Sequence, residues 1–261
     1  MSNLKLLYGS NKPWSNYHPV NDSIRGGKSN SSFVISPSNV ATFAGELDIT
    51  ALGGAGFASQ STTFESPRLS LPSAAYSGLS IGLLLPSSST TGSEKQGGKV
   101  EPVQVRRIVL VLKNTKPPTR PDGRRESVIS YEFEFDVEDL ACGSSSELAS
   151  DEEKQIGAEQ RKREVQVSAE WSDFKATYRG RPKEDAPPLD PSDIYELSWM
   201  CRSSFGYQAG PFSLDIVSLS AVRREATIRR GLVGVIHRIW IGFLKLFSRL
   251  TRRRDGSIRL D

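Results

Sequence analysis

The stretch Ile24–Phe33 reads IRGGKSNSSF and contains Gly27-Lys28-Ser29, a sequence of the type that ends a phosphate-binding loop. Such a loop needs an earlier glycine and a following helix, whose backbone N–H groups face the phosphates. Here the earlier position is Asp22, and SSFVIS, which follows, has the composition of a strand. We therefore interpret Gly26-Gly27 as a tight turn that leads into a strand, because glycine accepts a positive φ there.

Glu132 and Glu134 also have a spacing that permits chemistry. They alternate along SVISYEFEFDV (Ser127–Val137), so a strand places both on one face, about 7 Å apart. Such a separation suits an inverting glycosidase. Alternating glutamates are also common on the exposed face of an antiparallel sheet, and we expect no carboxylates that converge in a cleft. The sequence therefore predicts no catalytic residue.

The cysteines and histidines are too few and too far apart to form a recognisable site. Cys142 and Cys201 imply no disulfide framework, and neither they nor His18 and His237 have the spacing of zinc ligands. A Cys–His nucleophile pair has equally little support. We expect no metal, no cofactor and a reducing compartment.

The elements that must position these residues are strands. Helices do not alternate with them before residue 222, which excludes a doubly wound fold. About eight strands with uneven connections predict an all-β sandwich or jelly roll. The predicted strands are Asn39–Leu47, Gly56–Thr62, Gly78–Leu85, Arg106–Leu112, Ser127–Val137, Glu164–Trp171, Asp193–Arg202 and Pro211–Val222.

Two polar insertions and a basic tail complete the predicted organisation. The insertions at about 86–102 and 138–163 cannot bury enough apolar surface to offset their ordering entropy, so we expect mobile loops, the second with a short surface helix. Residues 1–222 then form one sandwich domain. Residues 223–261 form a tail of different character.

Several motifs together resemble the complex I intermediate-associated protein 30 family, including its fungal members. They are LGGAGFAS (Leu52–Ser59), WSDFKATYRGR (Trp171–Arg181), MCRSSFGYQAGPFSLDI (Met200–Ile216), YGSNKPWS (Tyr8–Ser15) and the Arg-Gly-Gly-x-Ser turn of IRGGKSNSSF. The resemblance covers Leu7–Val222. It implies a galactose-binding-like β-sandwich, no enzymatic activity, and a role in assembling mitochondrial respiratory complex I.

The WSDFKATYRGR segment is expected to contain buried residues in its first half and exposed residues in its second half. We expect Trp171 and Phe174 to be buried at the end of a strand, with Asp173 capping the turn between them. Tyr178 and its neighbouring arginines then project from a loop, and both residue types are enriched at protein interfaces. A second loop before the last strand, around Arg202, can lie on the same rim.

The partner-contact candidates come from these two loops and the early turn. An alternative is that the turn is structural with a solvated arginine, and that Arg179 or Arg202 pairs with a carboxylate such as Asp48 or Glu132. A further alternative is that aromatic and cationic loops bind a sugar. The candidates are Arg25, Gly26, Gly27, Trp171, Tyr178, Arg179, Arg181, Arg202 and Gln208.

Charge is unevenly distributed along the chain. Ten Lys and Arg residues and one Glu lie between Arg223 and Arg254, which gives this segment a net charge of +9. The whole chain carries +4, so the other residues carry −5. The globular part therefore has no basic face for a nucleic acid, and we expect none as a partner.

The tail segment Arg229–Arg254 predicts a strongly amphipathic basic helix. Charged side chains interrupt its apolar run and disfavour a membrane-spanning helix, so lying in the interface of an anionic membrane suits it better. A helix that packs on the sandwich or on a partner protein is the alternative. The membrane-surface candidates are Arg238, Ile239, Trp240, Phe243, Lys245, Phe247 and Arg249.

These features lead to two functional hypotheses. The first is a non-enzymatic assembly factor or chaperone-like scaffold for complex I that binds protein partners through sandwich loops, on the matrix side of the inner mitochondrial membrane. The second is a carbohydrate- or ligand-binding module, or a membrane-tethered adaptor outside mitochondria. No presequence is evident in MSNLKLLYGSNKPW, so a cytoplasmic location, or one peripheral to another membrane, is the alternative compartment.

Overall fold

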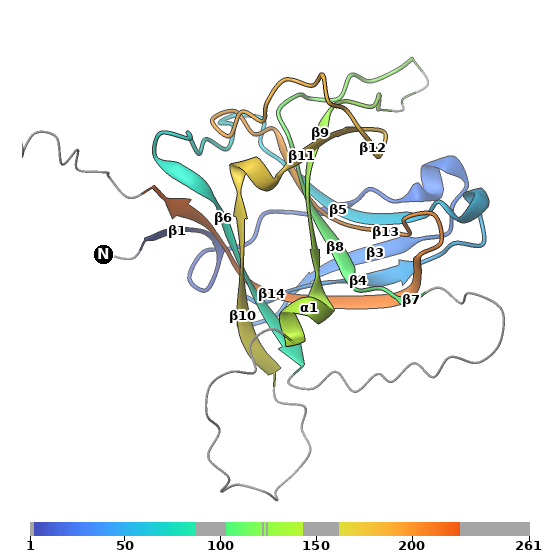
Figure 1. The fold of residues 1–261 in the computed structure, drawn as a ribbon, viewed down its shortest axis with the longest axis horizontal. Coiled ribbons are helices and arrows are strands. Elements are labelled where there is room, and N and C mark those ends of the chain that lie inside the picture. Colours follow the sequence, from blue (N-terminus) through green and yellow to red (C-terminus); the bar gives the residue numbers. More distant parts are fainter. Residues whose placement is uncertain (1–2, 87–102, 122, 124, 143–161, 225–261) are drawn as a thin grey trace, which may run out of the picture. The chain divides into compact units, whose positions relative to one another are not determined.

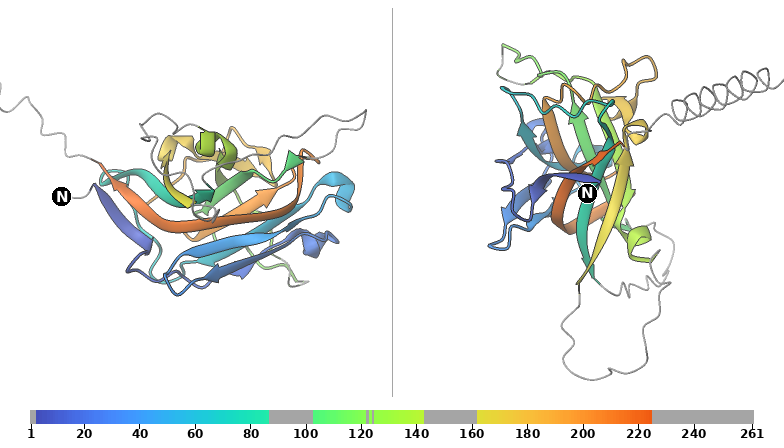
Figure 2. Two further views of the ribbon diagram at one scale, coloured as in Figure 1. Left: turned by 90° about the horizontal axis from the view of Figure 1, so that it is seen from below. Right: turned by 90° about the vertical axis from the view of Figure 1, so that its left-hand side faces the viewer.

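Two facing β-sheets make up the part of the chain that the computed structural model describes, which is residues 3–86, 103–121, 123, 125–142 and 162–224 (Figure 1). Figure 2 shows the same two layers from two further directions. The predicted all-β sandwich is therefore confirmed for these residues. None of the helices in these ranges is long and apolar enough to cross a membrane.

The first sheet is built around its longest strand. Its strands run in the order β10-β6-β14-β4-β3, and β1 and β7 also pair with β14. The bounds are β1 (Leu4–Gly9), β3 (Asn30–Ile35), β4 (Ala41–Leu47), β6 (Tyr76–Pro86), β7 (Val103–Gln104), β10 (Lys162–Glu170) and β14 (Gln208–Arg223).

The second sheet carries most of the residues discussed below. Its order is β12-β11-β9-β8-β13-β5-β2, and every neighbouring pair is antiparallel. The bounds are β2 (His18–Pro19), β5 (Phe57–Thr63), β8 (Arg107–Lys113), β9 (Ser130–Asp136), β11 (Lys175–Tyr178), β12 (Arg181–Pro182) and β13 (Glu196–Arg202).

Strand alternation fixes which side chains of the second sheet face the core. On β13, Leu197, Trp199 and Cys201 are fully buried and pack in the hydrophobic core. Burial also raises the pKa of the Cys201 thiol to about 12, so this cysteine is chemically inert. Glu196, Ser198 and Arg202 alternate with these residues and lie on the outer face.

The outer face continues in register across the neighbouring strands. Ser198 pairs with Val111, which in turn pairs with Glu132 on β9. Met200, Val109 and Glu134 form the next row. The predicted placement of Glu132 and Glu134 on one face is therefore confirmed, and it is the same face that carries Arg202.

The sequence predicted the long strands but missed β1 and the two-residue strands β2 and β7, and it predicted the short hairpin of β11 and β12 as a projecting loop. A six-residue helix, α1 (Val137–Cys142), begins the second predicted insertion, where we expected a short helix, and β10 takes up the last residues of that insertion. The remaining insertion residues, 87–102 and 143–161, and the tail from 225 lie outside the described residues.

Candidate functional site

The Arg25-Gly26-Gly27 stretch forms the predicted tight turn. It follows a short 3-10 helix, η1 (Asp22–Arg25), and Gly26 adopts the left-handed conformation with a φ of 86°. The N–H of Gly26 donates to the carbonyl of Ser23, at 3.0 Å. Strand β3 follows the turn, so a phosphate-binding loop, which needs a helix there, is excluded.

The side chain of Asp22 organises this turn. Asp22 is 1% exposed and accepts hydrogen bonds from the N–H and hydroxyl of Ser29, at 3.0 and 2.7 Å, and from the N–H of Phe57, at 3.1 Å. A Cβ on Gly27 would lie 2.2 Å from the Asp22 carboxyl carbon. Glycine is therefore required at position 27, and the turn is attached to the start of β5.

Ser203 makes a second connection between loops. Its hydroxyl donates to the carbonyl of Gly54 at 2.6 Å and accepts from the N–H of Gly56 at 2.9 Å. Its own N–H donates to the carbonyl of Gly56 at 2.9 Å. The segments 22–29, 48–56 and 203–207 therefore meet at one end of the sandwich, on the right in Figure 1, and we call them the three-loop rim.

Each loop of the rim exposes a large apolar side chain. Phe205 is 84% exposed, Ile24 is 56% exposed and Leu52 is 39% exposed. Leu52, Ser204 and Phe205 also have positive φ values of 52°, 48° and 61°, which are uncommon for residues other than glycine. Backbone strain of this kind is concentrated at binding sites. Exposed apolar groups in such a setting can contact a partner protein.

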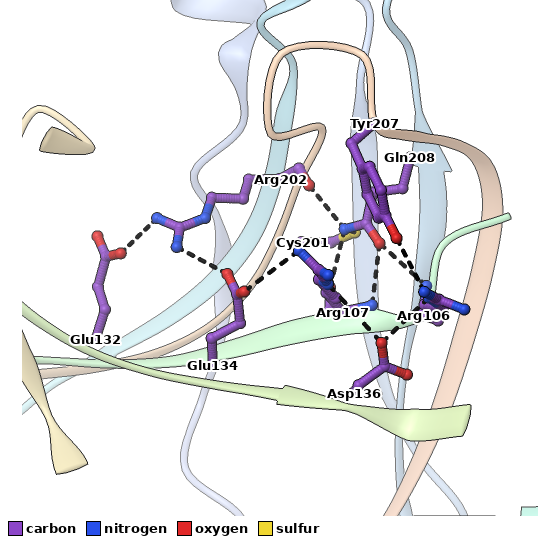
Figure 3. A network of polar contacts seen from close by, with 9 residues as sticks. All are labelled: Arg106, Arg107, Glu132, Glu134, Asp136, Cys201, Arg202, Tyr207 and Gln208. Atoms are coloured by element: carbon purple, nitrogen blue, oxygen red, sulfur yellow. Dashed lines mark hydrogen bonds and ion pairs between the residues drawn. The ribbon is translucent and has the colours of Figure 1, made fainter. Parts of the chain in front are cut away.

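Gln208 holds the base of the 203–207 loop (Figure 3). It is fully buried, its carbonyl oxygen accepts from the N–H groups of Arg106 and Arg107, at 3.1 and 3.0 Å, and its amide donates to the carbonyls of Arg107 and Arg202. We predicted Gln208 as a partner contact, but a side chain buried in this way joins β8, β13 and β14 instead. Its role is structural.

Arg202 forms an ion-pair network on the outer face of the second sheet (Figure 3). Its guanidinium binds the carboxylates of Glu132 and Glu134, the latter at 2.8 Å. Thr177 also donates to Glu132, at 2.6 Å. Burial disfavours the charged form of Arg202, but the two carboxylates outweigh it and raise the pKa of this guanidinium. The alternative that Arg202 pairs with Glu132 is thus confirmed.

An open cleft of about 610 Å³ lies over this network. Lys175, Gly180 and Pro182 of the β11–β12 region line one part of it, and Ser204 and Phe205 of the rim line another. The two predicted loops therefore do share one site. Glu132 and Glu134 line the same cleft, so our expectation that no carboxylates converge in a cleft was wrong. Because both bind the guanidinium of Arg202, they act as one salt-bridge network.

The first half of WSDFKATYRGR is structural, as predicted. Phe174 is 7% exposed, and the indole N–H of Trp171 donates to the carbonyl of Tyr76 at 2.9 Å. The carboxylate of Asp173 accepts from the N–H of Glu170 at 2.9 Å and caps the 3-10 turn η3 (Trp171–Asp173). Trp171, a predicted contact residue, is therefore used to attach this segment to the core.

The second half of the motif forms the tip of a hairpin. Tyr178 pairs with Arg181, and Arg179 and Gly180 between them have φ values of 53° and 74°. Positive φ at both central residues is typical of a type I′ turn. Tyr178, Arg179 and Arg181 are exposed, and the guanidinium of Arg179 lies over the ring of Tyr178, 5.3 Å from its centroid. These three residues remain available to a partner.

Two further predictions have different outcomes. The guanidinium of Arg25, a predicted partner contact, lies over the ring of Phe57, 5.8 Å from the centroid. The membrane-surface candidates between Arg238 and Arg249 lie outside the described residues. Among the residues that are described, His, Cys, Asp and Glu side chains do not gather into a group of three that could hold a metal ion.

Two solved structures resemble this chain at very low sequence identity. They are family 11 carbohydrate-binding modules from Clostridium thermocellum, one from the cellulase Lic26A-Cel5E and one in complex with a β-1,3-1,4-mixed-linked tetrasaccharide. The first is 8% identical with a TM-score of 0.44 and covers 85% of this chain and 95% of its own; the second is 10% identical with a TM-score of 0.43 and covers 84% and 95%.

Sequence comparison connects the chain to a family. A protein of Schizosaccharomyces pombe that is described as uncharacterized is 28% identical over 226 residues, which is 84% of each chain. The family described as complex I intermediate-associated protein 30 (CIA30) matches residues 6–83 and 146–216, more than half of the chain. These residues include all three loops of the rim. The chain belongs to the CIA30 family.

Proposed function

We propose that this protein is a non-enzymatic, chaperone-like factor in the assembly of mitochondrial respiratory complex I, and that it binds a protein partner through the three-loop rim. The family is named for an association with complex I intermediates. One observation carries the proposal: Ile24, Leu52 and Phe205 are exposed to solvent on loops that are held in place by hydrogen bonds of the buried residues Asp22 and Ser203.

The rim has the physical properties of a preorganised contact surface. Hydrogen bonds to buried Asp22 and Ser203 hold the loops before any partner arrives, so binding costs less ordering entropy. Exposed apolar side chains also gain free energy when a partner removes them from water. Aromatic and arginine side chains concentrate binding energy at interfaces, and Phe205 and Arg25 supply both types on the rim.

The basic tail supports a membrane-proximal location within this proposal. We infer that it lies in the interface of an anionic membrane on the matrix side of the inner mitochondrial membrane, with Trp240 and Phe243 inserted. Deleting Arg229–Asp261 should release the protein from mitochondrial membranes in a fractionation with protease protection. If the full chain is recovered outside mitochondria, a membrane-tethered adaptor takes the place of the assembly role.

The rim is tested with a variant that spares the cleft. Ile24→Ser combined with Leu52→Ser removes two exposed apolar anchors, and we expect roughly tenfold weaker partner binding. In cells that carry only this variant, native gels should show less assembled complex I and more of its intermediates. Val34→Ser is the matched control, because Val34 is 61% exposed on β3 and outside the rim. Normal complex I in the double variant would contradict the proposal.

A further inference from the structure

The cleft over the Arg202 network has the composition of a ligand site in its own right. Three carboxylates line it, from Glu132, Glu134 and Asp173, and two cations, from Lys175 and Arg202. Its volume of about 610 Å³ lies within the usual range for small-molecule sites. We propose that this cleft binds a neutral, hydroxyl-rich ligand, namely a saccharide, and this inference does not depend on the assembly role.

Most of the charged side chains that line the floor of the cleft already have partners within the protein. Arg202 binds Glu132 and Glu134 together, and Thr177 donates to Glu132. One oxygen of the Asp173 carboxylate accepts from the N–H of Glu170. A charged ligand would have to compete with these pairs and pay the desolvation of its own charge. A neutral ligand avoids both costs.

The floor nevertheless keeps hydrogen-bonding capacity at its open side. The side chains of Glu134 and Arg202 are 34% and 28% exposed, although they bind each other. A carboxylate can accept about four hydrogen bonds and a guanidinium can donate five, so both have positions left. Hydroxyl groups both donate and accept, and neighbouring hydroxyls on one ring can therefore bind an exposed carboxylate and an exposed guanidinium side by side.

An aromatic ring stands next to this polar floor. Phe205 lines the cleft with 84% of its surface exposed. The faces of aromatic rings carry partial negative charge and attract the positive edges of C–H groups. A saccharide presents an apolar C–H face on one side and hydroxyls around its rim, so it can contact Phe205 and the Glu134–Arg202 pair at once. Such a cleft matches this ligand class better than a hydrocarbon or a multiply charged ligand.

The probes that test this inference are soluble oligosaccharides of glucose, galactose and mannose. They are compared by saturation-transfer NMR and calorimetry with an oligogalacturonate, which is anionic, and an oligolysine, which is cationic, all with the full chain. We expect at least one neutral oligosaccharide to bind. Its affinity should change less than about twofold between roughly 50 and 500 mM salt, because ionic screening has little effect on an uncharged ligand.

Variants place the binding in the cleft and separate it from the rim. Glu134→Leu removes an exposed acceptor and should weaken saccharide binding by about tenfold or more, while Ile24→Ser, outside the cleft, should leave it unchanged. The inference is overturned if no neutral oligosaccharide binds, if the charged probes bind more tightly, or if Glu134→Leu binds as well as the unchanged chain. Loss of complex I in the rim variant with intact saccharide binding would show that saccharide binding does not need Ile24 and Leu52.

Discussion

The three-loop rim and the floor of the cleft are neighbours that are built in opposite ways. On the rim, buried polar groups of Asp22 and Ser203 fix the loops, and different residues, Ile24 and Phe205, face the solvent. On the floor, Glu132 and Arg202 both stabilise the sheet surface and line the cleft. On the rim, therefore, the residues that stabilise the loops differ from those that are exposed to a partner, whereas on the floor the same residues do both. Substitutions should show this difference in their effects on stability and on binding.

The largest expected loss of stability follows from substitution of Asp22, which fixes the loops of the rim. Asp22→Ala removes a 1% exposed carboxylate and leaves three donors, from Ser29 and Phe57, without their acceptor. Hydrogen bonds to charged groups contribute more than neutral ones, so we expect a loss of roughly 3 kcal/mol in the free energy of unfolding. Urea unfolding followed by tryptophan fluorescence measures it.

The control for this prediction is Asp185, an exposed aspartate that binds a residue close to it in sequence. Asp185→Ala removes an exposed carboxylate that binds the neighbouring Lys183, and its unfolding midpoint should stay close to that of the unchanged chain. If Asp22→Ala unfolds at the same urea concentration as Asp185→Ala, the rim is not held by Asp22.

The second prediction compares the two carboxylates that share Arg202. Glu132 has a side chain that is 7% exposed and a second donor, Thr177, whereas the Glu134 side chain is 34% exposed. We expect Glu132→Ala to cost about 2 kcal/mol of stability and Glu134→Ala less than about 1 kcal/mol, since solvent screens the exposed pair. Equal losses in urea unfolding would show that burial does not distinguish the two.

A third carboxylate on the same face, that of Glu196, should make the stability of the fold depend on pH. Glu196 is 2% exposed, and Lys113 binds it at 2.6 Å. Burial alone would raise the pKa of Glu196, but Lys113 and the nearby hydroxyls outweigh burial and lower it. The stabilisation by this ion pair is therefore complete above the unfolded pKa of about 4.5 and is lost as pH falls through the lower folded pKa.

Glu196→Gln tests this dependence. The variant should be less stable than the unchanged chain near neutral pH, and its stability should fall less steeply as the pH drops below about 4.5. Urea midpoints measured over a series of pH values give both slopes. Parallel slopes would mean that Glu196 does not contribute to the acid sensitivity of the fold.

Much of the fold follows from strand alternation, but the pairing of its polar residues does not. The pattern of Ser127–Val137 places Glu132 and Glu134 on one face, and β9 confirms it. Their shared partner, Arg202, was only one of the alternatives, because β9 and β13 are separated by β8 and meet only through long-range pairing. Periodicity fixes a face, whereas the order of strands decides which residues meet on it.

The sequence did not reveal the roles of two buried polar residues at the site, Asp22 and Gln208. Asp22 precedes an Arg-Gly-Gly turn and reads as a solvated loop residue, yet it accepts the N–H of Phe57, 35 positions away. Gln208 reads as an exposed amide in a loop, yet its side chain joins three strands. A signal was available only for Asp22, since Gly27 leaves room only for its carboxylate.

Substitution of Phe205, an exposed residue of the rim, should change stability least and be the most informative about function. Phe205 has a φ of 61° and is 84% exposed, so the fold gains little from burying its ring. A left-handed conformation costs most residues about 1–2 kcal/mol, but asparagine tolerates it. Phe205→Asn should therefore leave stability unchanged or raise it by about 0.5 kcal/mol, while it weakens both partner binding and saccharide binding.

Val34→Asn is the matched control for this substitution. Val34 is also exposed and apolar, at 61%, but it lies in strand β3, where asparagine is disfavoured. We expect a small loss of stability there and no loss of complex I assembly. If Phe205→Asn instead lowers the free energy of unfolding by more than about 1 kcal/mol, the phenylalanine ring packs on the fold and is not simply exposed for contact. A protein that is more stable yet inactive would mean that Phe205 is kept, strained and exposed, for contact with a ligand or partner.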